Sequence, residues 1–147
     1  KHNGSKDQRC QHNLNYWQFG DYLGLGAGAH GKLTKISPNT IQRSSRCKHP
    51  QQYMQQAGSP DSLQIQIINE PAELIFEFLM NHLRLGTPVA QSLFSQRTGL
   101  QWLQLKDASK SAVELDLVKI DDRTLYLTSQ GKKFLNDTLM TYLPLNQ

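Results

Sequence analysis

The residues with the most chemical potential form a glycine-rich loop near the start of the chain. The loop contains Gly24, Gly26, Gly28 and Gly31, and its centre is the run Gly26-Ala27-Gly28-Ala29-His30. Glycine lets the backbone approach a ligand closely or adopt a positive φ, because it carries no Cβ. A dinucleotide-binding loop would need a surrounding βαβ unit, which the sequence does not indicate. The loop therefore predicts either a close backbone contact with a ligand or a structural turn.

Three side chains are candidate ligands for iron or haem. Cys10, His12 and His30 carry the thiolate and imidazole groups that serve as axial haem donors. Their spacing along the chain does not establish that they converge. The alternative for each is an ordinary exposed or hydrogen-bonded side chain, and no other metal ligand is predicted.

The sequence offers no catalytic constellation. No serine lies in the glycine-flanked elbow of a hydrolase, and Asp121 and Asp122 are adjacent within a turn. We therefore predict no catalytic residue in this chain.

The positive charge is concentrated in the first part of the chain. The net charge of +4 arises because residues 1–64 hold eight Lys and Arg against three Asp and Glu, whereas residues 65–147 hold eight against nine. The basic part suits either an anionic ligand or a solvated surface. Nucleic-acid binding depends on Lys and Arg that neutralise phosphates, so the second part predicts no nucleic-acid partner.

Composition points to a chain that folds in a reducing compartment. No apolar run reaches the roughly 18 residues that span a bilayer, and no secretory signal peptide is evident. The two cysteines form no spaced motif, so we expect free thiols and a cytoplasmic location.

Weak patterns precede a change in composition near residue 57. Residues 21–26 predict a short buried strand, residues 40–43 a second strand, and residues 50–56 a short helix with Tyr53 and Met54 facing inward. The Gly, Ser, Pro and Asp residues that follow are typical of turns. We place a linker at residues 58–66.

Stronger patterns follow the linker. Glu70, Pro71 and Glu73 suit the first turn of a helix over residues 70–85, with His82 on its polar edge. Further helices are predicted at 89–96 and 107–116, a hairpin at 118–127, and a last helix capped by Ser129. Helices followed by a hairpin and a helix indicate a winged-helix-like domain. The first of these helices has the widest apolar stripe, made of Ala72, Leu74, Ile75, Phe76, Phe78, Leu79, Met80 and Leu83.

Several motifs in the same order resemble one family. They are Cys-Gln-His-Asn-Leu-Asn-Tyr-Trp at 10–17, Asp-Tyr-Leu-Gly-Leu-Gly-Ala-Gly-Ala-His-Gly at 21–31, Phe-Leu-Met-Asn at 78–81, Arg-Thr-Gly-Leu at 97–100 and the run from Leu127 to Asn136. With these motifs the chain resembles the C-terminal portion of the HemN/HemW family of radical-SAM proteins, which includes oxygen-independent coproporphyrinogen III oxidase. The first motif and the Ala-His-Gly end of the loop resemble the HemW branch more than the oxidase branch.

The resemblance implies a fold and a division into domains. The fold class would be α+β, with residues 1–57 as the tail of a radical-SAM partial (β/α) barrel. Residues 58–66 would be the linker, and residues 67–147 the family's helical, winged-helix-like C-terminal domain.

The resemblance also implies cofactors and partners. The full-length parent would bind S-adenosyl-L-methionine and a [4Fe-4S] cluster, with Gly26, Ala27, Gly28, Ala29 and His30 close to the S-adenosyl-L-methionine. The cysteines that bind the cluster have no match here, so this chain alone is not expected to be an enzyme. Membership of the HemW branch implies a haem chaperone that binds haem or a porphyrin and serves respiratory haem proteins. Two alternatives stay open, namely a coproporphyrinogen III oxidase and a stand-alone protein-interaction or nucleic-acid module.

Overall fold

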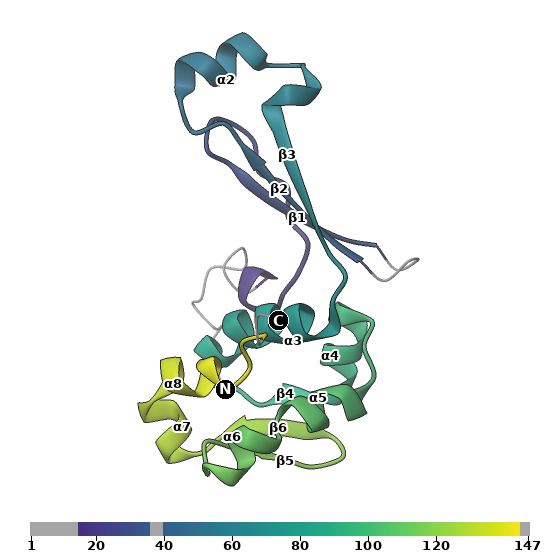
Figure 1. Cartoon of the computed structure of the whole chain (residues 1–147), viewed down its shortest axis with the longest axis vertical. Coiled ribbons are helices and arrows are strands. Elements are labelled where there is room, and N and C mark those ends of the chain that lie inside the picture. The colour runs from purple at the N-terminus through teal and green to yellow at the C-terminus, as the bar shows by residue number, and fades with distance from the viewer. Residues whose placement is uncertain (1–14, 36–39, 145–147) are drawn as a thin grey trace, which may run out of the picture.

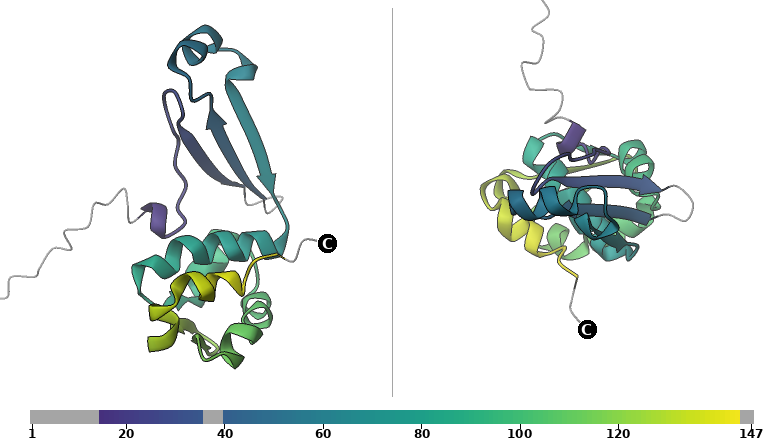
Figure 2. Two further views of the ribbon diagram at one scale, coloured as in Figure 1. Left: turned by 60° about the vertical axis from the view of Figure 1, so that its left-hand side comes forward. Right: turned by 90° about the horizontal axis from the view of Figure 1, so that it is seen from above.

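The structure of the chain is a computed structural model that describes residues 15–35 and 40–144. A narrow antiparallel sheet projects from a bundle of short helices, and the two parts meet at helix α3, Pro71–His82 (Figure 1). A side view and a view along the sheet show the sheet standing above the helical part (Figure 2). The described residues are thus α+β, as expected.

The projecting sheet contains three strands in sequential order. They are β1 (His30–Lys35), β2 (Thr40–Arg46) and β3 (Leu63–Ile68), with β2 antiparallel to both neighbours. Helix α2 (Pro50–Gln56) and the 3-10 turn η1 (Pro60–Ser62) connect β2 to β3 at the outer end of the sheet (Figure 1).

The register gives the sheet two different faces. Directly opposed residues share a face and successive residues alternate between faces. One set, which we call the polar face, contains His30, Lys32, Arg43, Ser45, Gln64 and Gln66. The other set mixes apolar and polar side chains: it contains Leu33, Ile65 and Ile67 together with Lys35, Gln42 and Ser44.

The helical part consists of short elements around a second small sheet. In order, they are α3, η2 (Leu83–Leu85), β4 (Val89–Ala90), α4 (Gln91–Thr98), α5 (Trp102–Ala108), α6 (Lys110–Glu114), β5 (Val118–Ile120), β6 (Thr124–Leu127), α7 (Ser129–Lys133) and α8 (Leu135–Met140). The strands β4, β5 and β6 form an antiparallel sheet in the order β4-β6-β5. No described helix has the length and apolar character needed to cross a membrane.

Local chemistry explains the strongest of these elements. Pro71 begins α3, and Gly86 ends η2 with a positive φ of 67°, a conformation that glycine adopts without strain. In the β5–β6 turn, the Asp121 carboxylate accepts hydrogen bonds at 2.7 Å from the backbone N–H groups of both Arg123 and Thr124. The Trp102 indole N–H donates to the Asp121 carbonyl at 2.8 Å, which ties α5 to the hairpin.

The hydrophobic core lies around Phe78 on α3. The Phe78 ring meets Phe19 edge-on at 5.7 Å between centroids and Phe94 at 5.3 Å. Ile41 and Ile68, from the inner end of the polar face, belong to the same buried cluster. The sheet and the helical part therefore share one core.

Residues 21–26 do not form the buried strand that we expected. Tyr22 makes an isolated antiparallel bridge with Lys32, while Leu23 and Leu25 are 73% and 87% exposed. The segment runs along the outer side of β1, where no other described element covers these leucines. The prediction that Leu23 and Leu25 are buried was therefore wrong.

The last four residues of the expected linker, 63–66, belong to the projecting sheet. Strand β3 begins at Leu63, inside residues 58–66, and pairs with β2 along its length. The alternation of Gln with Leu and Ile over 63–67 is a strand pattern that the preceding turn residues obscured. Strand β1 was also not expected.

Other boundaries differ by a few residues. The helix expected at 107–116 is two helices, α5 and α6, which begin at Trp102 behind a capping box of Gln101 and Gln104. The last helix is broken at Phe134, and Thr128 rather than Ser129 caps its first segment. Helix α2 is present, but Met54 is 72% exposed instead of inward-facing.

Candidate functional site

The glycine-rich loop leads into β1 and is hydrogen-bonded to the end of β2. The Ala29 N–H donates to the Gly26 carbonyl at 3.2 Å, which closes a turn. The Gly28 N–H donates to the Cys47 carbonyl at 2.8 Å, and the Arg46 N–H donates to the Ala29 carbonyl at 2.9 Å. These bonds fix the loop to the neighbouring strand.

Backbone conformation explains two of the glycines. Gly26 and Gly28 have φ values of 103° and 71°, which residues with a Cβ rarely adopt. A Cβ on Gly26 would meet no described atom within 4 Å, so the space beside it is open. The loop thus combines a glycine-dependent turn with free access to the backbone.

His30 is the first residue of β1 and is exposed on the polar face. It borders a shallow hollow of about 370 Å³ whose lining includes Arg43, Ser45, Gln64 and Gln66. This lining consists mainly of hydrogen-bonding groups with one cation. It suits a polar or anionic ligand better than the apolar plane of a porphyrin.

The other two proposed haem ligands lie outside the described residues. Cys10 and His12 precede residue 15, where the structure first describes the chain. Their approach to His30 therefore stays a prediction. Within residues 15–35 and 40–144, no group of three His, Cys, Asp or Glu side chains could hold a metal ion.

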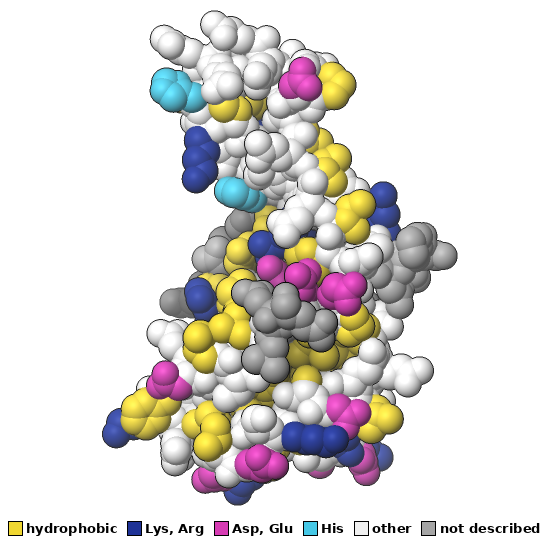
Figure 3. Space-filling model, in the orientation of Figure 1, with side chains coloured by type: hydrophobic (Ala, Val, Ile, Leu, Met, Phe, Trp, Pro, Cys, Tyr) yellow, Lys and Arg dark blue, Asp and Glu magenta, His cyan; other side chains and the backbone are white. Residues whose placement is uncertain are grey.

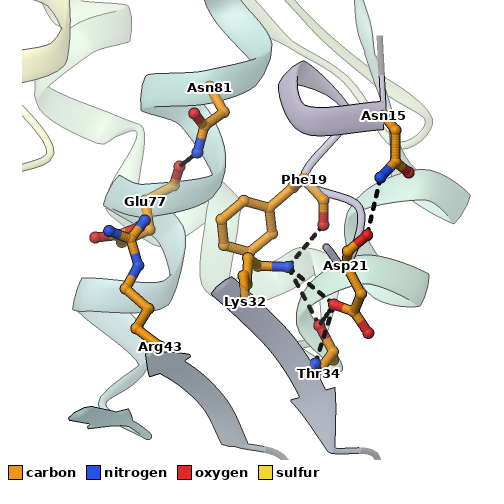
Figure 4. A network of polar contacts seen from close by, with 8 residues as sticks. All are labelled: Asn15, Phe19, Asp21, Lys32, Thr34, Arg43, Glu77 and Asn81. Atoms are coloured by element: carbon orange, nitrogen blue, oxygen red, sulfur yellow. Dashed lines mark hydrogen bonds and ion pairs between the residues drawn. The ribbon is translucent and has the colours of Figure 1, made fainter. Parts of the chain in front are cut away.

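A buried lysine, not predicted from the sequence, supports the segment that leads into the loop (Figure 4). Lys32 is only 2% exposed, and its ammonium donates to the Phe19 carbonyl at 2.8 Å. It also contacts the Asp21 carboxylate at 3.4 Å and the Thr34 hydroxyl at 3.2 Å, and it lies 3.8 Å from the centre of the Phe19 ring. These contacts connect β1 to residues 19–21.

Opposing effects set the pKa values of Lys32 and Asp21 in this cluster. Burial lowers the pKa of the Lys32 ammonium, and the nearby Asp21 carboxylate only partly opposes that effect. Burial alone would raise the pKa of the Asp21 carboxyl, but hydrogen bonds from the backbone N–H and hydroxyl of Thr34, together with Lys32, lower it overall. The Thr34 N–H and hydroxyl donate at 3.0 and 2.7 Å.

An ion pair connects the sheet with the helical part. Arg43 on β2 pairs with Glu77 on α3, and the two side chains are 31% and 17% exposed. Burial raises the pKa of the Glu77 carboxyl, while the Arg43 guanidinium opposes the increase. The sticks in Figure 4 show this pair beside the Lys32 cluster, at the base of the sheet.

The sequence missed these polar contacts because their partners are far apart along the chain. Lys32 and Phe19 are separated by 13 residues, and Arg43 and Glu77 by 34. A lysine between two strand residues is normally solvated. Lys32 is buried because the fold brings Phe19 and Asp21 against it.

Comparisons with known proteins confirm the resemblance to the HemN/HemW family. Residues 69–134 match the family model of the HemN C-terminal domain. The helical part therefore carries a HemN C-terminal domain.

Relatives named Heme chaperone HemW extend the match toward the glycine loop. The chain is 38% identical to the one from Haemophilus influenzae over 135 residues, and 35% identical to the one from Escherichia coli. Each match covers 92% of this chain and 34% of the relative. The chain is thus homologous to HemW proteins and spans about a third of their length.

A solved structure supports the fold independently. The chain resembles the radical-SAM coproporphyrinogen III oxidase (HemN) of Escherichia coli with a TM-score of 0.55. The match covers 84% of this chain and 28% of the oxidase at 18% identity. This similarity applies to the fold alone.

Proposed function

We propose that this chain is the C-terminal part of a haem chaperone of the HemW type. The main support is the 38% identity to a relative named Heme chaperone HemW. That match covers 92% of the chain and thus both the sheet and the helical part. The ligand would be haem or a porphyrin, and the recipients respiratory haem proteins. A cytoplasmic location accords with this role.

We also propose the finer division of the fold. Residues 1–57 would be the tail of the radical-SAM barrel and residues 67–147 a winged-helix-like domain. The order of α3, β4, α4, α5 and the β5–β6 hairpin supports the second assignment. The match of the family model, which begins at residue 69, supports a boundary near residue 67.

The glycine loop fits a position close to S-adenosyl-L-methionine. Open space beside Gly26 and the glycine-dependent turn permit a ligand to approach the backbone from Gly26 to His30. The [4Fe-4S] cluster does not fit this chain, because its two cysteines cannot supply the three thiolates of the family's CxxxCxxC motif. Those ligands would come from the rest of the parent, where the cluster supplies the electron for radical chemistry.

Haem titration of the full-length parent tests the function. We expect a Soret band to form on addition of haem, and transfer of haem to an apo respiratory haem protein. The His30→Ala, Cys10→Ala and His12→Ala variants identify the axial ligand by the shift or loss of that band. If the parent binds no haem but decarboxylates coproporphyrinogen, the oxidase alternative is correct.

A second assay tests the role of the isolated chain. Mixed with a reductant and S-adenosyl-L-methionine, the 147-residue chain should release no 5′-deoxyadenosine, because it lacks the cluster ligands. The reconstituted full-length parent serves as the positive control. Turnover by the isolated chain would contradict the assignment of the cluster to another part of the parent.

A further inference from the structure

The turn that precedes the glycine loop contains a strained residue. Phe19 has a φ of 59°, a left-handed conformation that is unfavourable for a large side chain. Gly20 has no room for a side chain, because a Cβ there would overlap the side chain of Asn15. Its N–H donates to the Asn15 carbonyl at 2.7 Å. A strained turn of this kind persists only where the surrounding contacts enforce it.

Lys32 supplies contacts that hold this turn (Figure 4). Its ammonium donates to the Phe19 carbonyl at 2.8 Å and lies 3.8 Å from the centre of the Phe19 ring. The same ammonium contacts the Asp21 carboxylate at 3.4 Å, and that carboxylate also accepts hydrogen bonds from the N–H and the hydroxyl of Thr34. One side chain therefore contacts the backbone and the ring of the strained residue and the acid that follows it.

Acidic groups compensate the charge of this ammonium, although Lys32 is only 2% exposed. Asp21 is its direct partner, and the ammonium also acts electrostatically on Glu77 of α3, whereas Arg43 and Arg97 oppose its charge. Figure 3 shows acidic side chains where the sheet meets the helical part. An apolar side chain could fill the same space without the cost of burying a charge, but it could not donate to a carbonyl. The lysine is therefore suited to fixing the turn rather than to packing alone.

The segment that Lys32 holds forms the base of the glycine loop. Tyr22 exchanges two backbone hydrogen bonds with Lys32, at 3.0 and 2.8 Å. Gly24 then lies so close to His30 that a Cβ on Gly24 would overlap the His30 carbonyl. The loop, residues 24–30, thus begins and ends beside the Tyr22–Lys32 pair. A shift of residues 19–22 would move one end of the loop.

We propose that Lys32 is a positioning residue for the glycine loop. By fixing residues 19–22 against β1, it sets how the backbone from Gly26 to His30 faces a bound ligand. That ligand would be S-adenosyl-L-methionine, so this part of the inference rests on the proposed function. The fixing of the loop by Lys32 does not depend on the identity of the ligand.

Hydrogen exchange in the 147-residue chain tests the positioning role directly. Lys32→Met keeps a long unbranched side chain but removes the donor. The N–H groups of Gly28 and Ala29 should then exchange at least about tenfold faster, because their hydrogen bonds open more often when the turn relaxes. The β5–β6 hairpin should exchange at the wild-type rate. Lys35→Met, which replaces an exposed lysine on the same strand, is the matched control and should change neither rate.

Binding of S-adenosyl-L-methionine to the reconstituted full-length parent tests the consequence for the ligand. At a temperature where circular dichroism shows every variant folded, Lys32→Met should bind at least about tenfold more weakly than the wild type, because the loop is no longer preorganised. Lys35→Met should bind with wild-type affinity. A lysine that only stabilised the fold would lower the melting temperature and leave the affinity of the folded protein unchanged.

A milder variant covers the case in which Lys32→Met does not fold. Thr34→Val keeps the ammonium and the β-branched shape, but it removes the hydroxyl that contacts both Lys32 and Asp21. Loop exchange should rise and affinity should fall, each by a smaller factor than in Lys32→Met.

Three results would overturn the proposal. One is wild-type exchange at Gly28 and Ala29 in both Lys32→Met and Thr34→Val, and another is equally accelerated exchange in the loop and the β5–β6 hairpin. The third is faster loop exchange with unchanged affinity for S-adenosyl-L-methionine. If the wild-type parent does not bind S-adenosyl-L-methionine, the proposed cofactor position is wrong, and the exchange rates alone decide whether Lys32 fixes the loop.

Discussion

His82 illustrates how strongly packing can alter a side chain that the sequence placed on a polar edge. It is 3% exposed and its ring stacks on Phe78 at 5.6 Å. Its Nε2 lies 3.2 Å from the Pro88 carbonyl, which can only accept, so Nε2 carries the proton of the neutral ring. The buried Nδ1 has no hydrogen-bond partner among the described residues.

This geometry predicts a pH-dependent stability. Burial lowers the pKa of His82, so as pH falls below 6.5 the unfolded state takes up a proton before the folded state does. Stability then falls by about 1.4 kcal/mol for each pH unit over which only the unfolded state is protonated. Denaturant unfolding between pH 7.5 and about 5 should show this loss in the wild type and a smaller loss in His82→Phe. If the free energy of unfolding falls equally steeply with pH in both proteins, His82 is not the titrating group.

Phe78 is an aromatic side chain at the centre of the shared core. It is fully buried and contacts Phe19, His82 and Phe94. Phe78→Ala should destabilise the chain by about 3–5 kcal/mol, because the cavity cannot collapse onto rings from three segments. Phe134→Ala is the control, since Phe134 is 44% exposed and its loss should cost about 1 kcal/mol or less. Similar midpoints in denaturant for both variants would contradict this view of the core.

The glycine loop is the element on which the cofactor assignment depends. Gly28→Val should strain the turn, because a β-branched residue at a φ of 71° is unfavourable by about 1–3 kcal/mol. In the full-length parent we expect weaker binding of S-adenosyl-L-methionine, measured by calorimetry, with the helical part still folded by circular dichroism. Leu25→Val, at a position that is 87% exposed, should leave the affinity unchanged. Wild-type affinity in Gly28→Val would leave the loop as a structural turn.

The ion pair between β2 and α3 predicts an energetic coupling between the sheet and the helical part. Arg43→Met alone leaves the half-buried Glu77 carboxylate without its cation, so it should destabilise more at pH 7 than Arg43→Met combined with Glu77→Gln. A double-mutant cycle should give a coupling of about 0.5–3 kcal/mol. Strictly additive effects would mean that the pair does not join the two parts.

The elements with local signals were predictable from the sequence, and those that depend on distant partners were not. Helix α3 and the β5–β6 hairpin follow from an apolar stripe and from turn residues within a few positions. The glycine loop was located by its spacing, but its attachment to Arg46 and Cys47 requires the strand pairing. The buried Lys32 could not be foreseen, because its partners Phe19 and Asp21 lie 13 and 11 residues away along the chain, and a lysine in a strand is normally solvated.

At the scale of the whole molecule, the shared core bears on whether the helical part is an independent domain. Residues 69–147 retain the fully buried Leu74, Phe78, Phe94 and Leu105. They lose Phe19 and Ile41, which are each 1% exposed in the complete chain. Burying a side chain of this size contributes about 1.5–3 kcal/mol, so the loss is considerable but affects one side of the core only.

We therefore expect residues 69–147 to melt cooperatively, but at a lower temperature than the complete chain. The lower melting temperature would arise because Phe78 loses its contact with Phe19. When Phe78→Leu is introduced into both chains, their melting temperatures should differ less, because a smaller side chain depends less on Phe19. The measurement is calorimetric unfolding of both chains at equal concentration. A non-cooperative melt of residues 69–147 would show that the sheet and the helical part form a single folding unit, because α3 then needs Phe19, Ile41 and Ile68 to complete its core.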